Sequence, residues 1–199
     1  MLEPVILPAV LQEFGGRLQQ FGRKAPIFAE GQEALHYYQL DYGLVKMANY
    51  GAKRERTQKF FFPGESFGEP ALLGGFAYPA AAVATEPSGV WLLPRADFYH
   101  MLRQAPEAHL RLTRHLCNRL LYKNMLLRGA AEETPEARIL ALLRYYRRQT
   151  AATGAFRVPF TRQEIADMLG LRVETVIRAC LELIRNGALQ RQDRTLILP

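Results

Sequence analysis

Residues 161–186 read TRQEIADMLGLRVETVIRACLELIRN, and their pattern predicts the structure of the C-terminal part of the chain. It opens with a capping box, in which the Thr161 hydroxyl and the Glu164 carboxylate can each accept a hydrogen bond from the other residue's backbone N–H. A short helix should therefore begin here and end near Leu169. Gly170 then supplies a tight turn.

A second helix is predicted over residues 172–186, with Gly187 as its stop. The small Ala166 lets the two helices cross closely, because a larger side chain would push them apart. Two short helices joined by a glycine turn are typical of a helix-turn-helix, which enters the major groove of DNA. The residues expected to pack the two helices together are Ile165, Ala166, Leu169, Leu171 and Val176. The inward face of the second helix is expected to continue through Cys180, Leu183 and Ile184.

Residues 188–198 predict a two-stranded wing that turns at Asp193 and Arg194. The formal charge is +7, and from Glu132 onward the chain has eleven arginines, no lysines and eight acidic residues. Guanidinium groups suit phosphate oxygens and guanine edges better than ammonium groups do. Charge alone also fits proteins without a polyanionic partner, and a plain three-helix bundle is the structural alternative. The winged helix-turn-helix nevertheless favours double-stranded DNA as the partner.

Residues 106–128 contain no internal proline or glycine and predict one long helix of roughly 35 Å. Its leucines occupy more than one face, so we expect it to cover both its own N-terminal domain and a second copy of the chain. Burial against one domain alone is the alternative. The polar segment 129–134 marks a domain boundary, and Thr134 caps the next helix ahead of Pro135. The side chains predicted at the homodimer contact are Leu112, Leu116, Leu120, Lys123 and Leu127.

Residues 24–94 consist of short strand-like runs separated by glycine and proline, which predicts an antiparallel β-barrel or β-roll. The clearest runs cover residues 36–40, 57–62 and 90–93. The expected fold class is therefore α+β. Three parts are predicted along the chain: the roll (1–105), a dimerisation helix with its hinge (106–131) and the winged helix-turn-helix (132–199).

The sequence offers no chemistry typical of an enzyme. Cys117 and Cys180 are too far apart to form a CxxC metal cage, and the four histidines show no HxH or HExxH spacing. A cupin-like metal enzyme would need a His/Glu triad that is absent, so we expect neither catalysis nor a cofactor. We expect neither a signal peptide nor a membrane span, since no basic region precedes a long apolar run, and the expected compartment is the cytoplasm without membrane association.

With these elements placed, the chain resembles the Crp/Fnr family of transcription regulators along nearly its whole length. The resemblance is most specific in residues 63–73 (PGESFGEPALL) and 160–178 (FTRQEIADMLGLRVETVIR). It implies an N-terminal cyclic-nucleotide-binding-like β-roll, a long dimerisation helix and a C-terminal winged helix-turn-helix. It also implies a homodimer that binds a palindromic promoter site and activates transcription by contacting RNA polymerase. Residues 150–155 are the expected contact with the polymerase.

By this resemblance, Glu174 and Arg178 read a G·C pair, the carboxylate accepting from cytosine and the guanidinium donating to guanine. Residues four apart lie on one helix face, which supports the pairing, although an exposed salt bridge within the helix would show the same spacing. Val173 stands where the cyclic-AMP-responsive branch has a guanine-reading arginine. We therefore expect a half-site that keeps the inner G·C of a TGA-like core and tolerates T at the outer G of TGTGA. The candidates for contacts with the DNA backbone are Arg162, Gln163, Arg172 and Thr175. A basic face that is merely exposed to solvent would show the same residues.

The roll departs from the cyclic-AMP branch where that branch holds its ligand. Pro79 and Ala80 replace an Arg-Ser pair that binds the cyclic phosphate, and a buried phosphate would lack its guanidinium partner. Lys123 and Asn124 replace a Thr-Ser pair that faces adenine. We therefore expect cyclic-AMP independence. The residues of a possible effector pocket are Gly68, Glu69, Pro79, Ala80, Lys123 and Asn124.

Other forms of sensing stay open at this point. Gly68 and Glu69 can shape the roll without binding a ligand, whereas an unidentified small effector could still gate the same DNA-binding fold. A haem held by His36 or His100 is a further alternative. Cys117, on the predicted dimer helix, could pair with its counterpart across a twofold axis or act as a small buried hydrophobe.

Overall fold

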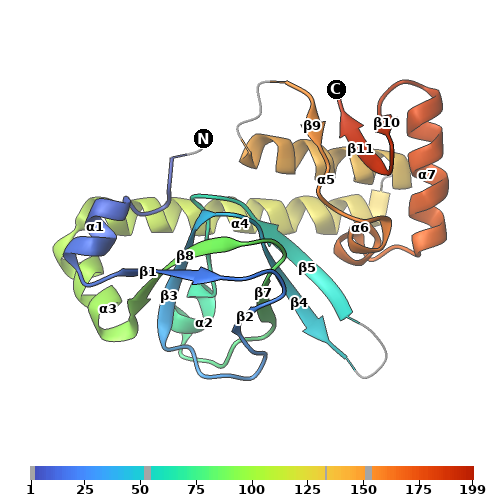
Figure 1. The fold of residues 1–199 in the computed structure, drawn as a ribbon. Coiled ribbons are helices and arrows are strands. Elements are labelled where there is room, and N and C mark those ends of the chain that lie inside the picture. Colours follow the sequence, from blue (N-terminus) through green and yellow to red (C-terminus); the bar gives the residue numbers. More distant parts are fainter. Residues whose placement is uncertain (1–2, 52–54, 133, 151–153) are drawn as a thin grey trace. The chain divides into compact units, whose positions relative to one another are not determined.

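The computed structural model describes residues 3–51, 55–132, 134–150 and 154–199. The chain separates into two units, Met1–Cys117 and Asn118–Pro199, and the division falls inside the long helix. The fold is α+β, as predicted, with a β-rich first unit and a mainly helical second unit that ends in a small sheet (Figure 1). The predicted domain boundaries after residues 105 and 131 remain predictions.

The first unit is built around two antiparallel four-stranded sheets, in the orders β1-β8-β3-β6 and β2-β7-β4-β5. The predicted strand runs appear as β3, β5 and β8, each within two residues of its expected limits. The strands are β1 (Arg17–Phe21), β2 (Pro26–Phe28), β3 (His36–Tyr42), β4 (Val45–Tyr50), β5 (Glu55–Phe61), β6 (Ser66–Phe67), β7 (Ala81–Ala84) and β8 (Ser88–Pro94). The helices are α1 (Pro8–Glu13), α2 (Glu69–Gly74), α3 (Arg95–Gln104) and the start of α4 (Pro106–Glu132).

Aromatic side chains fill the core of this unit. Tyr37 stacks on Phe98 with ring centroids 4.9 Å apart, and Tyr38 stacks on Phe67 at 5.5 Å. Gln39, only 1% exposed, binds the N-terminal segment through its amide, which accepts from Ile6 N (2.8 Å) and donates to Ile6 O (2.8 Å). Because both bonds are buried, the residues before α1 form part of the packed roll.

Lys59 on β5 and Glu65, which lies between β5 and β6, form a buried ion pair. Their Nζ and Oε1 atoms are 2.8 Å apart, and each side chain is 5% exposed. The second carboxylate oxygen of Glu65 accepts from the Phe62 backbone N–H at 2.9 Å. The Lys59 ammonium also lies 4.7 Å from the centre of the Phe61 ring. The pair therefore has hydrogen bonds that offset part of the cost of burying two charges.

The long helix α4 confirms the prediction of one continuous helix and corrects its end. We expected a break from residue 129, whereas the helix continues through Gly129 to Glu132. A glycine ends a helix when it adopts the left-handed conformation, and elsewhere it costs only about 1 kcal/mol relative to alanine. The expected cap was found at the next helix, where Thr134 Oγ1 accepts from Ala137 N at 3.3 Å.

The second unit packs the C-terminal part of α4 against α5 (Pro135–Gln149) and a winged helix-turn-helix. Tyr122 of α4 stacks on Tyr145 at 4.1 Å, and Tyr146 packs against Phe160 at 4.6 Å. The inward face of α5 consists of Ile139, Leu142, Leu143 and Tyr146, which are all 0% exposed. The remaining elements are β9 (Phe156–Arg157), α6 (Arg162–Leu169), α7 (Val173–Arg185), β10 (Gln190–Gln192) and β11 (Thr195–Leu198).

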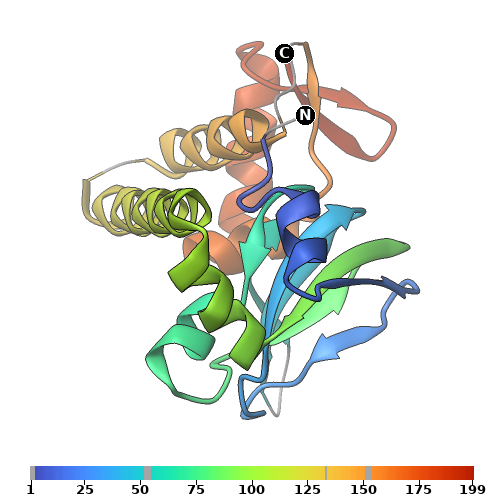
Figure 2. The same cartoon turned by 90° about the vertical axis from the view of Figure 1, so that its left-hand side faces the viewer.

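The wing is a hairpin that a third strand extends. Strands β10 and β11 pair antiparallel, as predicted, and the sheet order is β10-β11-β9 (Figure 2). The register places Arg157 of β9 opposite Ile197 of β11. A strand that precedes the helix-turn-helix in sequence therefore lies beside a strand that follows it. None of the helices in the described ranges combines the length and apolarity needed to cross a membrane.

Candidate nucleic-acid interface

The helix-turn-helix begins with the predicted capping box. Thr161 Oγ1 accepts from Glu164 N at 3.2 Å, and Glu164 Oε2 accepts from Thr161 N at 2.8 Å. The two bonds satisfy backbone donors at the start of α6 that a helix leaves without partners inside itself. The beginning of α6 is thus fixed by two residues only three positions apart, which is why the sequence alone could identify it.

The turn and the crossing of the two helices also follow from single residues. Gly170 has a φ of +63°, in the left-handed region that favours glycine, and Leu171 N donates back to Ala166 O at 2.9 Å. Ala166 is 0% exposed, as its small size at the crossing predicts. Of the remaining packing residues, Ile165, Leu169, Val176, Cys180 and Leu183 are buried, while Leu171 and Ile184 are half-buried.

One face of α7 is open to solvent and carries Glu174 and Arg178 together. In the described residues no ion pair joins the two side chains, and the salt bridge of α7 links Arg185 to Glu182 near its other end. The structure therefore does not support the alternative in which Glu174 and Arg178 form a salt bridge within the helix. The same face also exposes Ile177 and Leu181, each 45% exposed, which sequence analysis did not identify. Two exposed apolar side chains beside base-reading candidates are suited to contact thymine methyl groups.

The candidate backbone contacts differ in how free their side chains are. Arg172, the N-cap of α7, is exposed, and Thr175 is half-buried. Gln163 donates to Asp167 Oδ1 at 2.8 Å, so its amide is already engaged within α6. Arg162 lies beside Cys180: burial raises the pKa of that thiol, and the guanidinium opposes the shift. Arg162 and Arg172 are thus the stronger candidates of the four.

The five predicted dimer residues separate into two groups. Leu112 is 1% exposed within the core of the first unit, and Leu116 is partly buried against the same core. The side chain of Leu112 therefore offers no free surface to a second copy. Leu120 and Leu127 are 70% and 73% exposed, and Lys123 is also exposed. These exposed leucines leave an apolar surface on α4, and their part in a contact between two copies stays a prediction.

The predicted effector residues in the roll surround a packed interior. Gly68 has a φ of +78°, and a Cβ there would lie 3.1 Å from the Tyr78 ring and 3.2 Å from the Phe28 ring. Those two rings stack at 3.8 Å. Pro79 is exposed, and Ala80 beside it is 0% exposed.

Glu69 is engaged inside the fold. Its side chain is 0% exposed, and Oε1 accepts from Ser66 Oγ at 3.1 Å and lies 3.8 Å from His115 Nε2. Burial, and after it the charge of Glu69, raises the pKa of Tyr37 far above its ordinary value. Lys123 and Asn124 belong to the other unit, and their part in an effector pocket stays a prediction.

The histidines considered for haem lie apart in the roll. His36 is half-buried, and this burial lowers its pKa. His100 is exposed on α3 and packs edge-on against Phe14 at 5.6 Å. Across the described residues there is no group of three or more His, Cys, Asp or Glu side chains arranged to hold a metal ion.

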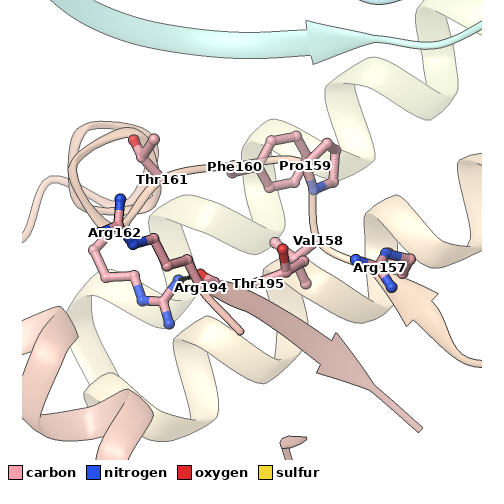
Figure 3. Close-up of a pocket in the computed structure, with 8 residues that line it drawn as sticks. All are labelled: Arg157, Val158, Pro159, Phe160, Thr161, Arg162, Arg194 and Thr195. Carbon is pink, nitrogen blue, oxygen red and sulfur yellow. Dashed lines mark hydrogen bonds between the residues drawn. The ribbon is translucent and has the colours of Figure 1, made fainter. Parts of the chain in front are cut away.

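Sequence analysis also missed Arg157 and Arg194. They line a cavity of about 510 Å³ together with Arg162, at the start of α6 (Figure 3). Arg157 and Arg162 are close in sequence, whereas Arg194 is distant from both and reaches this cavity because β9 pairs with β11. The excess of arginine in this part of the chain indicated a basic surface, but it could not predict which arginines line the same cavity.

Comparison with known proteins agrees with this arrangement. Residues 18–105 match the cyclic nucleotide-binding domain family, and residues 137–199 match the Crp-like helix-turn-helix domain family. The transcriptional activatory protein AadR of Rhodopseudomonas palustris is 30% identical over 188 residues, covering 90% of this chain and 77% of AadR. The cyclic AMP receptor protein of Thermus thermophilus is 29% identical over 191 residues, covering 95% of this chain and 86% of that protein.

The structure of FixK2 from Bradyrhizobium japonicum has the same fold, with a TM-score of 0.78 at 24% identity and 92% coverage of both chains. The chain therefore belongs to the Crp/Fnr family of transcription regulators. Members of this non-enzymatic family bind DNA through the Crp-type helix-turn-helix and are typically dimeric.

Proposed function

We propose that this regulator binds a palindromic promoter site as a homodimer, and that Glu174 and Arg178 read a G·C pair in each half-site. The observation that carries the proposal is the exposure of both side chains on one face of α7, without an ion pair between them in the described residues. Arg donates to guanine O6 and N7, and Glu accepts from cytosine N4. Because such a protein acts on the chromosome, its proposed compartment is the cytoplasm.

Val173, half-buried at the first position of α7, narrows the proposed half-site. A valine cannot donate to guanine, so no guanidinium is available there to read the outer G of a TGTGA half-site. The proposed half-site keeps the inner G·C and tolerates T at the outer position.

Selection from randomised duplexes tests both statements, using the wild-type chain, Arg178→Ala and, as a matched control, Arg185→Ala. Arg185 is exposed on the same helix but already paired with Glu182. Arg178→Ala should lose the preference for the inner G and weaken specific binding by about 1–3 kcal/mol, whereas Arg185→Ala should keep both. An unchanged preference in Arg178→Ala, or a strongly selected outer G in the wild type, would contradict the proposal.

We also propose that binding does not require cyclic AMP. Supporting this, Pro79 and Ala80 supply no cation for a cyclic phosphate, the Tyr78 ring packs on Gly68, and Glu69 already accepts from Ser66. The charge-assisted contacts that a buried phosphate needs are therefore missing from this part of the roll. The name of the Thermus relative describes a receptor for cyclic AMP, which makes a direct measurement necessary.

Adding cyclic AMP at millimolar concentration should leave the affinity for the selected duplex unchanged within twofold. Fluorescence anisotropy of a labelled duplex, with and without the nucleotide, measures this. Non-specific salt effects are controlled by adding the same concentration of AMP. An increase of tenfold or more with cyclic AMP, and none with AMP, would overturn the proposal.

The proposed action is activation through contact with RNA polymerase. AadR and a relative from Rhizobium leguminosarum are both named as activators. The predicted polymerase contact covers residues 150–155, of which 151–153 lie outside the described residues. Transcription in vitro from a promoter that carries the selected site would show whether the protein raises or lowers transcript yield.

A further inference from the structure

Arg138, near the start of α5, reaches the end of α6. Its Nη2 donates a hydrogen bond to the carbonyl oxygen of Leu169, the last residue of α6. Gly170 follows in the left-handed conformation, and α7 begins at Val173. The hydrogen bond therefore joins α5 to the point at which the chain leaves the first helix of the helix-turn-helix for the second.

The end of α6 is a favourable place for this cation. The carbonyl groups in the last turn of a helix carry a partial negative charge. The last turn of α6 contains Asp167 and no basic residue of its own. Near the start of α5, where Arg138 is attached, a positive charge is by contrast unfavourable. The favourable electrostatic contact of Arg138 therefore comes from α6 and not from its own helix.

Stability alone does not explain an arginine at this position. Arg138 is half-buried, and its Nε is buried without a hydrogen-bond partner among the described residues. A buried donor without a partner destabilises a fold. A methionine of similar length could fill the same space without that cost. The guanidinium therefore has a role other than packing.

A bound ligand does not account for the arginine either. The cavity beside it measures about 10 Å³, which is too small for anything larger than a water molecule. The other residues that line this cavity are Met125, Leu126, Gly129, Ala141 and Leu169. Arg138 thus lies where the C-terminal part of α4, the start of α5 and the end of α6 meet.

We propose that Arg138 is a positioning residue for DNA reading. By holding the Leu169 carbonyl it fixes the turn against α5, and it thereby sets the direction in which α7 presents Glu174 and Arg178. This role rests on the proposed reading of a G·C pair by those two side chains. The hydrogen bond acts at the end of α6 opposite to the capping box, so the two ends of the helix are held by different contacts. Base contacts need a fixed geometry, and a shift of the turn would move both reading side chains together.

Two variants of Arg138 and one control separate its charge from its packing. Arg138→Met removes the guanidinium and keeps a side chain of similar length. Arg138→Lys keeps a cation that can still reach the carbonyl. The control, Arg144→Met, removes the same charge from an exposed position of α5. The melting temperature of Arg138→Met should stay close to that of the wild type, because losing a hydrogen bond and losing a donor without a partner have opposite effects.

The DNA measurement uses anisotropy with the selected duplex and with a non-specific duplex. Arg138→Met should lose about tenfold in specific affinity, an effect of the size that one mismatched base pair has. Its affinity for the non-specific duplex should match that of the control, and Arg138→Lys should recover most of the specific affinity. A specific affinity equal to that of the control would contradict the proposed role. So would a slope of log K against log salt that is shallower than the control's by about 0.9 per half-site, because Arg138 would then be a phosphate contact.

Hydrogen exchange of the Leu171 amide tests the contact without DNA. This N–H donates to Ala166 O at 2.9 Å across the turn. In Arg138→Met it should exchange faster than in the wild type and in Arg144→Met, because the turn opens more often once Leu169 is released. Unchanged exchange would show that Arg138 does not hold the turn and would overturn the proposal. A wild-type chain that selects no duplex would refute the proposed function, while the exchange rate would still test the contact of Arg138.

Discussion

Replacing Leu120 and Leu127 together by glutamate is expected to make the protein monomeric and to weaken its binding to a palindromic duplex by about 10²–10⁴-fold. The two side chains are 70% and 73% exposed on α4. They belong to a stripe whose members alternate at spacings of three and four residues, the period of a coiled-coil seam. The members of this stripe, all exposed, are Leu110, Thr113, Cys117, Leu120, Asn124 and Leu127.

Glutamates on such a seam would face their counterparts across the twofold axis, so charge repulsion would add to the lost apolar burial. Sedimentation velocity measures the oligomeric state, and anisotropy measures the affinity for one half-site and for the full palindrome. A matched control is Leu18→Glu/Leu35→Glu, which adds the same charges at exposed leucines of the roll. A variant of α4 that stays dimeric would show that the contact between copies lies elsewhere.

Replacing Lys59 by methionine is expected to lower the free energy of unfolding of the first unit by about 3–5 kcal/mol. The change leaves the Glu65 carboxylate, 5% exposed, without the ammonium that lies 2.8 Å from it. Removing one partner of a buried ion pair is costly because the other charge stays in a medium of low dielectric constant. Urea unfolding followed by tryptophan fluorescence measures the loss, since the single tryptophan, Trp91, is buried in this unit.

The double variant Lys59→Met/Glu65→Gln separates the cost of the charge from the cost of packing. Glutamine is neutral but keeps an oxygen that can accept from Phe62 N, which now donates to Glu65 at 2.9 Å. We expect most of the lost stability to return in the double variant, because neither remaining side chain is charged. A double variant as unstable as Lys59→Met would point to lost packing around the lysine stem instead.

Features with local signals could be predicted from the sequence. The capping box at Thr161 and Glu164, the turn at Gly170 and the cap at Thr134 each depend on residues within four positions of one another. The structure shows all three. The strands of the roll were also predictable, because glycine and proline separate their apolar runs.

Features that depend on contacts between distant segments could not be predicted in the same way. Leucines occur on several faces of α4, so the sequence could not show that Leu112 serves the roll while Leu120 stays exposed. The end of the helix was placed too early because Gly129 looked like a stop signal. The cavity lined by Arg157 and Arg194 depends on the pairing of β9 with β11. That pairing could not be predicted, because the two strands are separated in the sequence by the helix-turn-helix.

The stacking of Tyr122 on Tyr145, at 4.1 Å, has a consequence for the spacing of the operator. Tyr122 lies on α4 between Leu120 and Leu127, so the C-terminal half of the proposed seam belongs to the same unit as the DNA-reading helices. In the proposed dimer, the packing of these two tyrosines would set the angle between the twofold axis and each recognition helix. Since each helical residue adds about 100° of rotation, one residue inserted between the seam and Thr134 would turn α7 away from its groove. In the proposed dimer, the spacing between half-sites would therefore depend on the number of helical residues between the seam and Thr134.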